Sequence, residues 1–350
     1  MKAAVLHASR DLRYEEIEKP QINDNEVLIR VRATGICGSD IPRVLADGAH
    51  FFPIVLGHEF SGVVAETGKN VSNVKVGDRV TAAPLVPCMK CADCQKGNYS
   101  LCKHYTFIGS RDFGSFADYV KAPALNVVKF DDSVDFVQAA FFEPATVALH
   151  GIKCADYHGG EDVAILGGGT VGLFTMQWAK ILGARRVVVF DISDARLELA
   201  KKLGADEVIN TTAPDFEKTA MALTHNGDGY GFVFETAGQN ATMAMAFEVA
   251  ANKASVCFIG TSSKDLAFSR SNFEKMNRKE FKLTGSWMSY SAPFPGDEWT
   301  MTAEYFGNGK LKYDPSLVYK KFPMEKAWDA FSMYLTPGAV KGKLMLVNED

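Results

Sequence analysis

A glycine-rich turn between an apolar strand and an apolar helix constrains the fold of this chain more than any other feature. It reads Gly167-Gly168-Gly169-Thr170-Val171-Gly172, which matches the pattern G-x-G-x-x-G. A β-prone run at 163–166 precedes the turn, and residues 171–182 are apolar on helical spacing. Glycines here permit a tight bend, a close approach of backbone to a pyrophosphate, and close packing of helix on strand. The context predicts a dinucleotide-binding turn rather than an unliganded glycine-rich loop, with Gly167, Gly169, Thr170, Val171 and Gly172 at the cofactor.

Strands and helices alternate around this turn. The expected strands lie at 163–166, 187–190, 207–209, 232–235, 255–259 and 281–285, and the expected helices at 171–182, 194–203, 214–224 and 240–250. Such alternation is typical of a parallel, doubly wound sheet, and six strands is the number that a dinucleotide-binding sheet uses. We therefore expect an α/β domain of the Rossmann type at 151–287.

An aspartate at the end of the second expected strand bears on the choice of cofactor. Asp191 follows Gly169 by 22 residues. A carboxylate at this point can accept hydrogen bonds from the ribose hydroxyls and would repel a 2′-phosphate, which favours NAD over NADP. Arg196 argues the other way, because an arginine nearby can bind that phosphate. Asp191 is the better placed of the two groups, so NAD is the expected cofactor.

The first 150 residues follow a different pattern, with short β-prone runs punctuated by glycine and proline. Residues 27–34 alternate between apolar and more polar side chains, and further runs lie at 60–64 and 79–82. This pattern predicts a barrel or sandwich. Residues 288–350 contain aromatic and proline-rich loops (287–299), a helix around 325–334 and a terminal strand at 343–347. We expect this last stretch to pack back onto the domain formed by residues 1–150, which gives the 350-residue chain two domains.

Four cysteines lie within fifteen residues, at Cys88, Cys91, Cys94 and Cys102. Four thiolates can close a tetrahedral shell around Zn²⁺ with no open position, and such sites are structural. The loop that carries them has little to form a core, so a metal would supply its order. An iron–sulfur cluster is the alternative, because closely spaced cysteines also bind clusters. A structural zinc is favoured, because a zinc lobe beside a dinucleotide-binding domain makes one consistent enzyme.

A second, open metal site is indicated by Cys37 and His58, each of which lies in a glycine-flanked turn after a β-prone run. A catalytic zinc takes three protein ligands and leaves a position for water or substrate. Glu143 is a lone carboxylate after an apolar run, and buried carboxylates are seldom unpaired, which makes it the candidate third ligand. Taken singly, each of these residues is more often structural than a ligand.

Composition narrows the classes of partner. The chain is 47% hydrophobic and 23% charged, as is ordinary for a soluble globular protein. Its net charge of −4 and the lack of a Lys/Arg-rich run argue against a nucleic-acid partner. No apolar stretch approaches the roughly 18 to 20 residues of a membrane helix, and no signal peptide is recognisable, so a cytoplasmic location is expected. Cys154 and Cys257 have apolar neighbours and are expected in the core rather than in a redox switch.

Together these residues resemble the zinc-containing medium-chain alcohol/polyol dehydrogenase family over essentially the full chain. The resemblance is carried by Gly35 to Asp40, Gly57-His58-Glu59, the four cysteines, Val76 to Val80, Glu143-Pro144, and the glycine turn with Asp191. It implies a GroES-like β-barrel catalytic domain interrupted in sequence by the Rossmann domain, two zinc ions per chain, NAD, and a homodimer or homotetramer. On the matched positions it implies a catalytic zinc held by Cys37, His58 and Glu143, with Glu59 beside it, Asp40 orienting the histidine, and Ser39 as a proton-relay hydroxyl.

Within this family the chain most closely resembles the galactitol-1-phosphate 5-dehydrogenases. That similarity is carried by residues 48–53, 107–111 and 285–290, by Pro295-Gly296 and by Glu298-Trp299. It implies the oxidation of galactitol 1-phosphate to tagatose 6-phosphate, and Glu143, where simple alcohol dehydrogenases carry cysteine, points to a polyol. Arg43 and Arg111 are candidates for binding the phosphate, because arginine grips phosphate in a bidentate way. The alternatives are an unphosphorylated polyol such as sorbitol, L-threonine, or a non-catalytic nucleotide-binding protein on the same fold.

Overall fold

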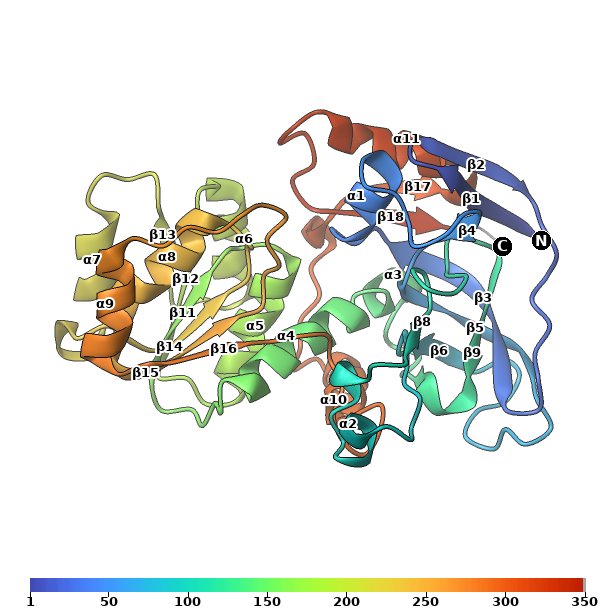
Figure 1. Ribbon diagram of the computed structural model, residues 1–350, viewed down its shortest axis with the longest axis horizontal. Helices are drawn as coiled ribbons and strands as arrows, with labels where there is room; N and C mark the ends of the chain where they lie inside the picture. Colours follow the sequence, from blue (N-terminus) through green and yellow to red (C-terminus); the bar gives the residue numbers. More distant parts are fainter. Residues whose placement is uncertain (349–350) are drawn as a thin grey trace. The chain divides into compact units, whose positions relative to one another are not determined.

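The structure is a computed structural model that describes residues 1–348, and it divides into two compact units (Figure 1). Unit 1 contains Met1–Glu143, Tyr290–Gly309 and the chain from Pro315 onward. Unit 2 contains Pro144–Ser289 and Lys310–Asp314. The chain thus leaves unit 1 after Glu143 and returns to it at Tyr290, and each unit has its own hydrophobic core.

Unit 1 is built mainly from antiparallel strands. Its largest sheet has the order β10-β6-β5-β3-β18-β17, and β9 also pairs with β3. These strands are β3 (Glu26–Gly35), β5 (Glu59–Thr67), β6 (Arg79–Ala82), β9 (Tyr119–Pro123), β10 (Val127–Lys129), β17 (Val318–Pro323) and β18 (Lys343–Val347). Smaller sheets contain β1 (Lys2–Ala8), β2 (Asp11–Glu16) and β4 (Ile54–Val55), and, separately, β7 (Leu85–Val86) and β8 (Thr106–Phe107). The strands expected at 27–34, 60–64, 79–82 and 343–347 are all present.

The terminal strand β18 joins the N-terminal part of the chain in one sheet. It runs antiparallel to β3, with Met345 opposite Gly35 and Val347 opposite Ala33, and parallel to β17. Leu344 and Leu346 of β18 are fully buried in the core cluster that also contains Phe116. Burial of these apolar side chains is worth roughly 1.5 to 3 kcal/mol each, so the last strand is an integral part of the unit 1 core.

Unit 1 also contains helices, most of them short. They are α1 (Asp40–Leu45), α2 (Ala92–Gln95), α3 (Phe136–Ala139), α10 (Asp297–Gly307) and α11 (Ala327–Ser332), and α4 (Phe142–Cys154) begins at the end of the first segment. The expected loop at 287–299 was wrong at its end, because Asp297 and Glu298 start α10 and Trp299 is buried in it. Acidic side chains in the first turn favour helix formation by interacting with the helix dipole. The helix expected at 325–334 is present as the shorter α11, flanked by 3-10 turns.

Unit 2 is a six-stranded parallel sheet in the order β13-β12-β11-β14-β15-β16 (Figure 1). The strands are β11 (Asp162–Leu166), β12 (Arg186–Asp191), β13 (Glu207–Asn210), β14 (Tyr230–Glu235), β15 (Ala250–Phe258) and β16 (Lys282–Gly285). This is the predicted doubly wound sheet. Leu166 lies opposite both Phe190 and Glu235, so the carboxyl ends of β11, β12 and β14 share one edge.

Helices connect the strands of unit 2. They are α5 (Thr170–Ile181), α6 (Asp194–Leu203), α7 (Phe216–Ala222), α8 (Asn240–Val249) and α9 (Arg270–Lys279). The first four match the expected helices to within a few residues. Helix α9 was not expected, because its sequence is strongly polar, but Ser269 and Asn272 form a capping box that fixes its start. Among the described residues of both units, the longest apolar helices fall short of what crossing a membrane requires.

Candidate active site

Strand pairing in unit 1 brings the turn after β3 next to the start of β5. Gly35, the last residue of β3, lies opposite Glu59, the first residue of β5. Cys37 and His58 lie just beyond these paired ends, and ligand atoms of Cys37, His58 and Glu59 all lie within 4.8 Å of one another. His58 and Glu59 are buried. Two residues that are distant in sequence, Cys37 and His58, are therefore neighbours, as a shared metal site requires.

A buried aspartate faces this cluster. Asp40 Oδ2 accepts a hydrogen bond from the Cys37 backbone N–H at 3.0 Å, and Asp40 Oδ1 lies 3.7 Å from His58 Nδ1. Burial raises the pKa of Asp40. Burial alone would lower the pKa of His58, but attraction to Asp40 and Cys37 raises it to about 10. The Ser39 hydroxyl donates to Cys37 Sγ at 3.4 Å. The His58 imidazole therefore lies among groups that favour a positive charge at this position.

Lys343 is a member of this site that sequence reasoning missed. Its Nζ lies 2.8 and 2.6 Å from the two carboxylate oxygens of Glu59 and 3.3 Å from the Ile36 carbonyl oxygen. Burial alone would lower the pKa of Lys343, but attraction to Glu59 and Cys37 raises it. A lysine before an apolar strand is typical of a strand end, so the sequence offered no signal for its role. Only the pairing of β18 with β3 places it at Glu59.

Glu143 belongs to the same electrostatic environment. It lies in the first turn of α4, directly after Phe141 and Phe142. Burial raises its pKa to about 7, with attraction by His58 opposing this shift and repulsion by Glu59 adding to it. Cys37, His58 and Glu59 have ligand atoms within 4.8 Å of one another, and Glu143 is not part of this group. Glu143 therefore interacts with His58 and Glu59 through the electrostatic effects of their charges.

The donor set fits a divalent cation. Asp40 and Glu59 are buried beside Cys37 and His58, the half-buried Glu143 interacts with His58 and Glu59 through its charge, and Lys343 contacts Glu59. His58 Nδ1 and Asp40 Oδ1 are buried without a hydrogen-bond partner. Buried polar atoms without partners are costly, and thiolate, imidazole and carboxylate together are a ligand set that zinc accepts. A metal ion would compensate the excess of buried negative charge.

The four cysteines of the lobe at 88–102 converge in space. Their sulfurs are 3.5 Å apart for Cys91 and Cys94, 3.9 Å for Cys91 and Cys102, and 4.0 Å for Cys88 and Cys94. A tetrahedral shell with metal–sulfur bonds of about 2.3 Å places sulfurs about 3.8 Å apart. All four thiols are free, and a disulfide would need sulfurs about 2 Å apart. The lobe therefore fits a closed, four-thiolate zinc site.

The surroundings of the lobe thiols shift their pKa values in opposite directions. A hydrogen bond from the Cys94 backbone N–H lowers the pKa of Cys91 to about 6, whereas burial raises the pKa of Cys94 to about 12. Backbone N–H groups of Cys88 and His104 also donate to Cys102 Sγ, at 3.3 and 3.4 Å. The backbone is thus arranged to stabilise negative charge on sulfur, and a bound cation would allow all four thiolates to coexist.

In unit 2 the glycine turn has the geometry that its sequence predicts. It connects β11 to α5, and Gly167 has a φ of +112°, which favours glycine. A side chain at position 172 would place its Cβ 1.9 Å from the Gly167 carbonyl oxygen, so only glycine allows this packing. A Cβ at Gly169, the N-cap of α5, would meet nothing within 4 Å. The start of α5, with Thr170 and Val171, thus offers open backbone N–H groups to a phosphate.

The Asp191 carboxylate accepts hydrogen bonds beside the glycine turn. Its Oδ2 accepts from the Gly168 backbone N–H at 2.7 Å, and its Oδ1 accepts from the Ser193 N–H at 2.9 Å. Arg196 Nη1 lies 3.6 Å from Asp191 Oδ2, which pairs the two groups that bear on cofactor choice. Because Asp191 ends β12 at the same sheet edge as the turn, it lies where a nucleotide ribose is bound in such folds.

The remaining residues singled out from the sequence lie in both units. Arg43 Nη1 donates to the Ser39 carbonyl oxygen at 2.6 Å, next to Cys37. Arg111 is exposed on the turn after β8, and its guanidinium lies 4.9 Å from the Tyr105 ring centre. Cys257 is fully buried and Cys154 is half-buried, so neither is an exposed thiol.

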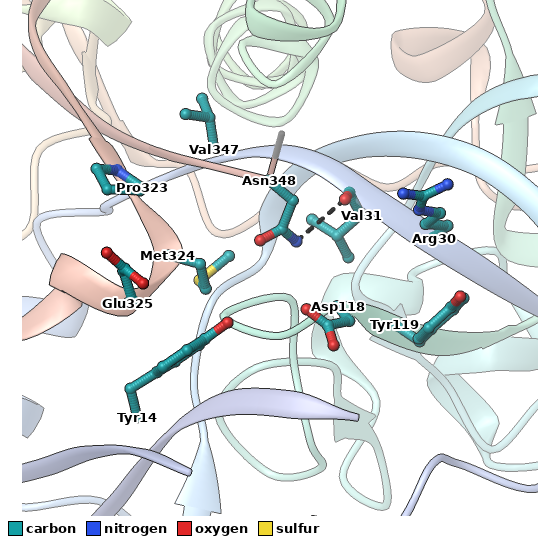
Figure 2. A pocket seen from close by; sticks show the side chains of 10 residues that line it. All are labelled: Tyr14, Arg30, Val31, Asp118, Tyr119, Pro323, Met324, Glu325, Val347 and Asn348. Carbon is teal, nitrogen blue, oxygen red and sulfur yellow. Dashed lines mark hydrogen bonds between the residues drawn. The ribbon is translucent and has the colours of Figure 1, made fainter. Parts of the chain in front are cut away.

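A polar cavity of about 460 Å³ in unit 1 lies apart from these residues. Figure 2 shows Tyr14, Asp118 and Asn348 among the side chains that line it. The Asn348 side chain donates to the Val31 carbonyl oxygen at 3.1 Å, which anchors the chain after β18. The candidate metal ligands do not line this cavity, so it is not the site that they form.

Comparison with known proteins identifies the family. Residues 23–132 match the family of alcohol dehydrogenase GroES-like domains, and residues 170–303 match the zinc-binding dehydrogenases. Galactitol 1-phosphate 5-dehydrogenase of Escherichia coli (strain K12) is 36% identical over 354 residues, covering 99% of this chain and 100% of that protein. L-threonine 3-dehydrogenase of Bacillus velezensis is 42% identical over 242 residues, covering 68% of this chain and 70% of that protein.

Solved structures agree. The crystal structure of galactitol-1-phosphate dehydrogenase from Escherichia coli superposes with a TM-score of 0.93 at 36% identity, over 99% of this chain and 100% of that one. A putative zinc-binding dehydrogenase from Sinorhizobium meliloti, bound to NADP, gives a TM-score of 0.89 at 27% identity, over 99% of both chains. With a GroES-like domain, a Rossmann sheet and full-length relatives of this kind, the chain belongs to the zinc-type medium-chain polyol dehydrogenases and is an oxidoreductase.

Proposed function

We propose that this dehydrogenase oxidises the secondary alcohol of a polyol phosphate, galactitol 1-phosphate to tagatose 6-phosphate, with NAD as the oxidant. The observation that carries the proposal is the 36% identity to a galactitol 1-phosphate 5-dehydrogenase across the full length of both chains. In the overall reaction the alcohol carbon loses hydrogen with its bonding electron pair to NAD⁺, and the hydroxyl proton leaves to solvent. The products are a ketone, NADH and a proton.

Cys37, His58 and Glu143 would hold the catalytic zinc, and Glu59 would lie beside it. Lys343 supports this choice between the two glutamates, because its ammonium contacts both carboxylate oxygens of Glu59. Burial raises the pKa of the Glu143 carboxyl to about 7, and a cation would stabilise its charged form. A zinc ion at this site would act as a Lewis acid and would lower the pKa of an alcohol hydroxyl toward the neutral range.

The chain's own residues would orient the site and carry the proton. Asp40 holds the Cys37 backbone through its Oδ2 and presents its Oδ1 to His58 Nδ1, which sets the orientation of the imidazole. The Ser39 side chain, exposed and bonded to Cys37 Sγ, would pass the substrate's proton toward solvent. Cys88, Cys91, Cys94 and Cys102 would hold the structural zinc and keep their loop folded.

In unit 2, the turn of Gly167, Gly169 and Gly172 with Thr170 and Val171 would bind the cofactor pyrophosphate. Asp191 would accept hydrogen bonds from the adenosine ribose, and this carboxylate supports NAD over NADP. Arg196 is the residue that a 2′-phosphate would need, but it already lies against Asp191. NAD⁺ supplies the acceptor for the hydride, and the protein's part is to position it.

NADH formation with a panel of substrates tests the proposal. Galactitol 1-phosphate, galactitol, sorbitol and L-threonine are supplied in turn with NAD⁺ or NADP⁺, and absorbance is followed at about 340 nm, where reduced nicotinamide absorbs. The proposal predicts the highest kcat/KM for galactitol 1-phosphate with NAD⁺. A preference for L-threonine is the second candidate outcome, because a threonine dehydrogenase is 42% identical over two thirds of the chain. Turnover of free polyols alone would remove the phosphate from the proposal.

We further propose a cytoplasmic homodimer or homotetramer. A reducing compartment would keep the four lobe thiols available to metal. The oligomer rests on the family resemblance. Light scattering on a size-exclusion column tests it, and a mass equal to one 38.2 kDa chain would contradict it.

A further inference from the structure

The loop that follows β14 lies next to the glycine turn, where the sheet of unit 2 reverses its strand order. From β11 the chain builds β12 and β13 on one side, and it then returns to β14 on the other side of β11. The glycine turn leaves the carboxyl end of β11, and residues 236–239 leave the carboxyl end of β14 at the same edge. In open α/β sheets, ligands bind where two such loops diverge. Contacts between these two loops therefore bear on the cofactor site.

Thr236, the first residue after β14, holds the start of the glycine turn. Its hydroxyl is shared between two carbonyl oxygens, those of Leu166 at 3.1 Å and of Gly167 at 3.0 Å. Its backbone N–H donates to the Leu166 carbonyl oxygen at 2.9 Å. The side chain and the backbone of one residue thus fix the two peptide groups through which β11 passes into the turn.

The Thr236 hydroxyl also fits closely against the glycines of the turn. A Cβ at Gly167 would lie 3.0 Å from Thr236 Oγ1, and a Cβ at Gly172 would lie 2.7 Å from it. The same Cβ at Gly172 would lie 1.9 Å from the Gly167 carbonyl oxygen, which is one of the two that Thr236 binds. The hydroxyl, the Gly167 peptide and the first turn of α5 are therefore packed together. A shift of Thr236 would move the N–H groups that face a phosphate.

A buried carboxylate fixes the loop that carries Thr236. The Glu235 side chain is fully buried. Its Oε1 accepts from the backbone N–H groups of Ala237 and Gly238, each at 2.9 Å, and from the Thr242 hydroxyl at 2.7 Å. A carboxylate excluded from water is costly unless such donors surround it, so the carboxylate and the loop stabilise each other. The residues on both sides of Thr236 therefore belong to one anchored segment.

We infer that Thr236 is a positioning residue for the cofactor, whose hydroxyl holds the glycine turn in the shape that binds the pyrophosphate, and that Glu235 fixes the loop that presents this hydroxyl. The inference rests on the proposed function for the place of the cofactor. A turn that is already ordered in the free protein loses less conformational freedom on binding, and this difference appears as affinity. Without the hydroxyl, the two carbonyl oxygens lose a donor and the turn gains conformations that do not fit the pyrophosphate.

The test measures NADH dissociation constants by fluorescence titration in the native protein and in T236V, T236S and T224V. Valine has the shape of threonine without the hydroxyl, whereas serine keeps the hydroxyl. Thr224 is the matched control, because its hydroxyl also donates to a carbonyl oxygen of unit 2, that of Met221 at 2.8 Å. It precedes His225, whose N–H binds Asp162 at the amino end of β11, opposite the cofactor edge.

T236V should weaken NADH binding about tenfold, which is the loss expected when a hydrogen bond to buried acceptors is removed. T236S and T224V should stay within about twofold of the native protein, although T224V should melt at a lower temperature, as T236V does. In steady-state assays T236V should raise KM for NAD⁺ and leave kcat at saturating NAD⁺ within about twofold, because the turn holds the pyrophosphate rather than the reacting carbon.

E235A tests the anchor of the loop. It should weaken NADH binding about as much as T236V does. The double variant E235A/T236V should bind NADH no more than about twofold more weakly than E235A, because both changes act through the same turn. Additive losses in the double variant would overturn the role of Glu235. Thermal melting checks that E235A is folded, and T236V carries the test alone if it is not.

The outcomes separate this inference from the proposed function. A native protein that binds neither NADH nor NADPH would contradict the proposed function and the inference with it. If the native protein binds NADH and T236V binds it equally well, the inference is overturned and the proposed function stands. Equal weakening in T236V and T224V would assign the effect to lost stability, and equal weakening in T236V and T236S would show that the hydroxyl has no part in binding. Either result also overturns the inference.

Discussion

In unit 2 the residues expected at the cofactor pyrophosphate follow one another along the chain, whereas in unit 1 the candidate zinc ligands come from three separate segments. Gly167 to Gly172 form one turn between β11 and α5. Cys37, His58 and Glu143 lie after β3, before β5 and at the start of α4. The unit 2 site is made of backbone N–H groups and glycines, and the unit 1 site of buried, charged side chains.

The two sites differ in how they affect the free energy of folding. A phosphate-binding turn uses N–H groups that a helix start leaves free in any case, so it adds little to the free energy of the fold. The unit 1 site brings the buried carboxylates of Asp40 and Glu59 together, and burying an ion costs several kcal/mol by the order-of-magnitude estimate for buried charges. Lys343 and a bound cation offset that cost. We therefore expect unit 1 to depend on metal and unit 2 to be independent of it.

Removal of a candidate zinc ligand should produce the largest difference between the two units. In H58A the catalytic metal site loses its imidazole, and turnover should fall at least about 1,000-fold, equal to roughly 4 kcal/mol of transition-state stabilisation. NADH binding, measured by fluorescence titration, should stay within about twofold of native, because the cofactor turn lies in unit 2. H7Q is the matched control, because His7 is a histidine of unit 1 that contacts Glu15 and is not among the candidate zinc ligands. Native turnover in H58A would contradict the metal assignment.

A substitution in the four-cysteine lobe should produce the second-largest effect. C94S removes a buried thiol from the four-cysteine set, so the loop at 88–102 should lose its metal and its order. We expect a loss of about 2 to 4 kcal/mol in the free energy of unfolding of unit 1, and faster proteolysis within the loop. Denaturant unfolding and mass spectrometry of the fragments measure both. C257A, in strand β15 of unit 2, is the control for loss of a buried cysteine, and an equally stable C94S would show that the lobe needs no metal.

A substitution at Asp191 tests the cofactor site of unit 2. D191A removes the carboxylate expected at the ribose, so NAD⁺ affinity should fall about 10- to 100-fold, and the preference over NADP⁺ should narrow. D162N is the matched control, because Asp162 is also buried but lies at the opposite end of its strand, bonded to the His225 N–H at 2.6 Å. Zinc content should be native in both variants. A loss of zinc in D191A would show that the two sites depend on each other.

The sequence predicted local structure well, because a helix or a strand is encoded by neighbouring residues. The six parallel strands, the glycine turn and α6 follow from periodicity and glycine spacing alone. Helix α9 was missed, because a polar helix lacks an apolar stripe and its capping box is the main signal. Helix α10 was missed, because proline and glycine before Asp297 are typical of a loop.

The site was predictable only in part. The spacing of the four cysteines carries its own chemistry, and the convergence of their sulfurs agrees with it. Cys37 and His58 were suggested by their turns, but only the pairing of Gly35 with Glu59 brings them together. Lys343 had no signal in the sequence. Its partner Glu59 lies far away along the chain, and a sequence does not state which strands pair.

The zinc content of the native protein tests the central claim, that unit 1 carries two metal sites of different kinds. Inductively coupled plasma mass spectrometry on protein purified without chelator, beside C37A, gives the number of ions per chain. The account predicts about two zinc ions per native chain and about one in C37A, because only the open site loses a ligand. One zinc per chain in a fully active native protein, or equal zinc in C37A, would contradict it.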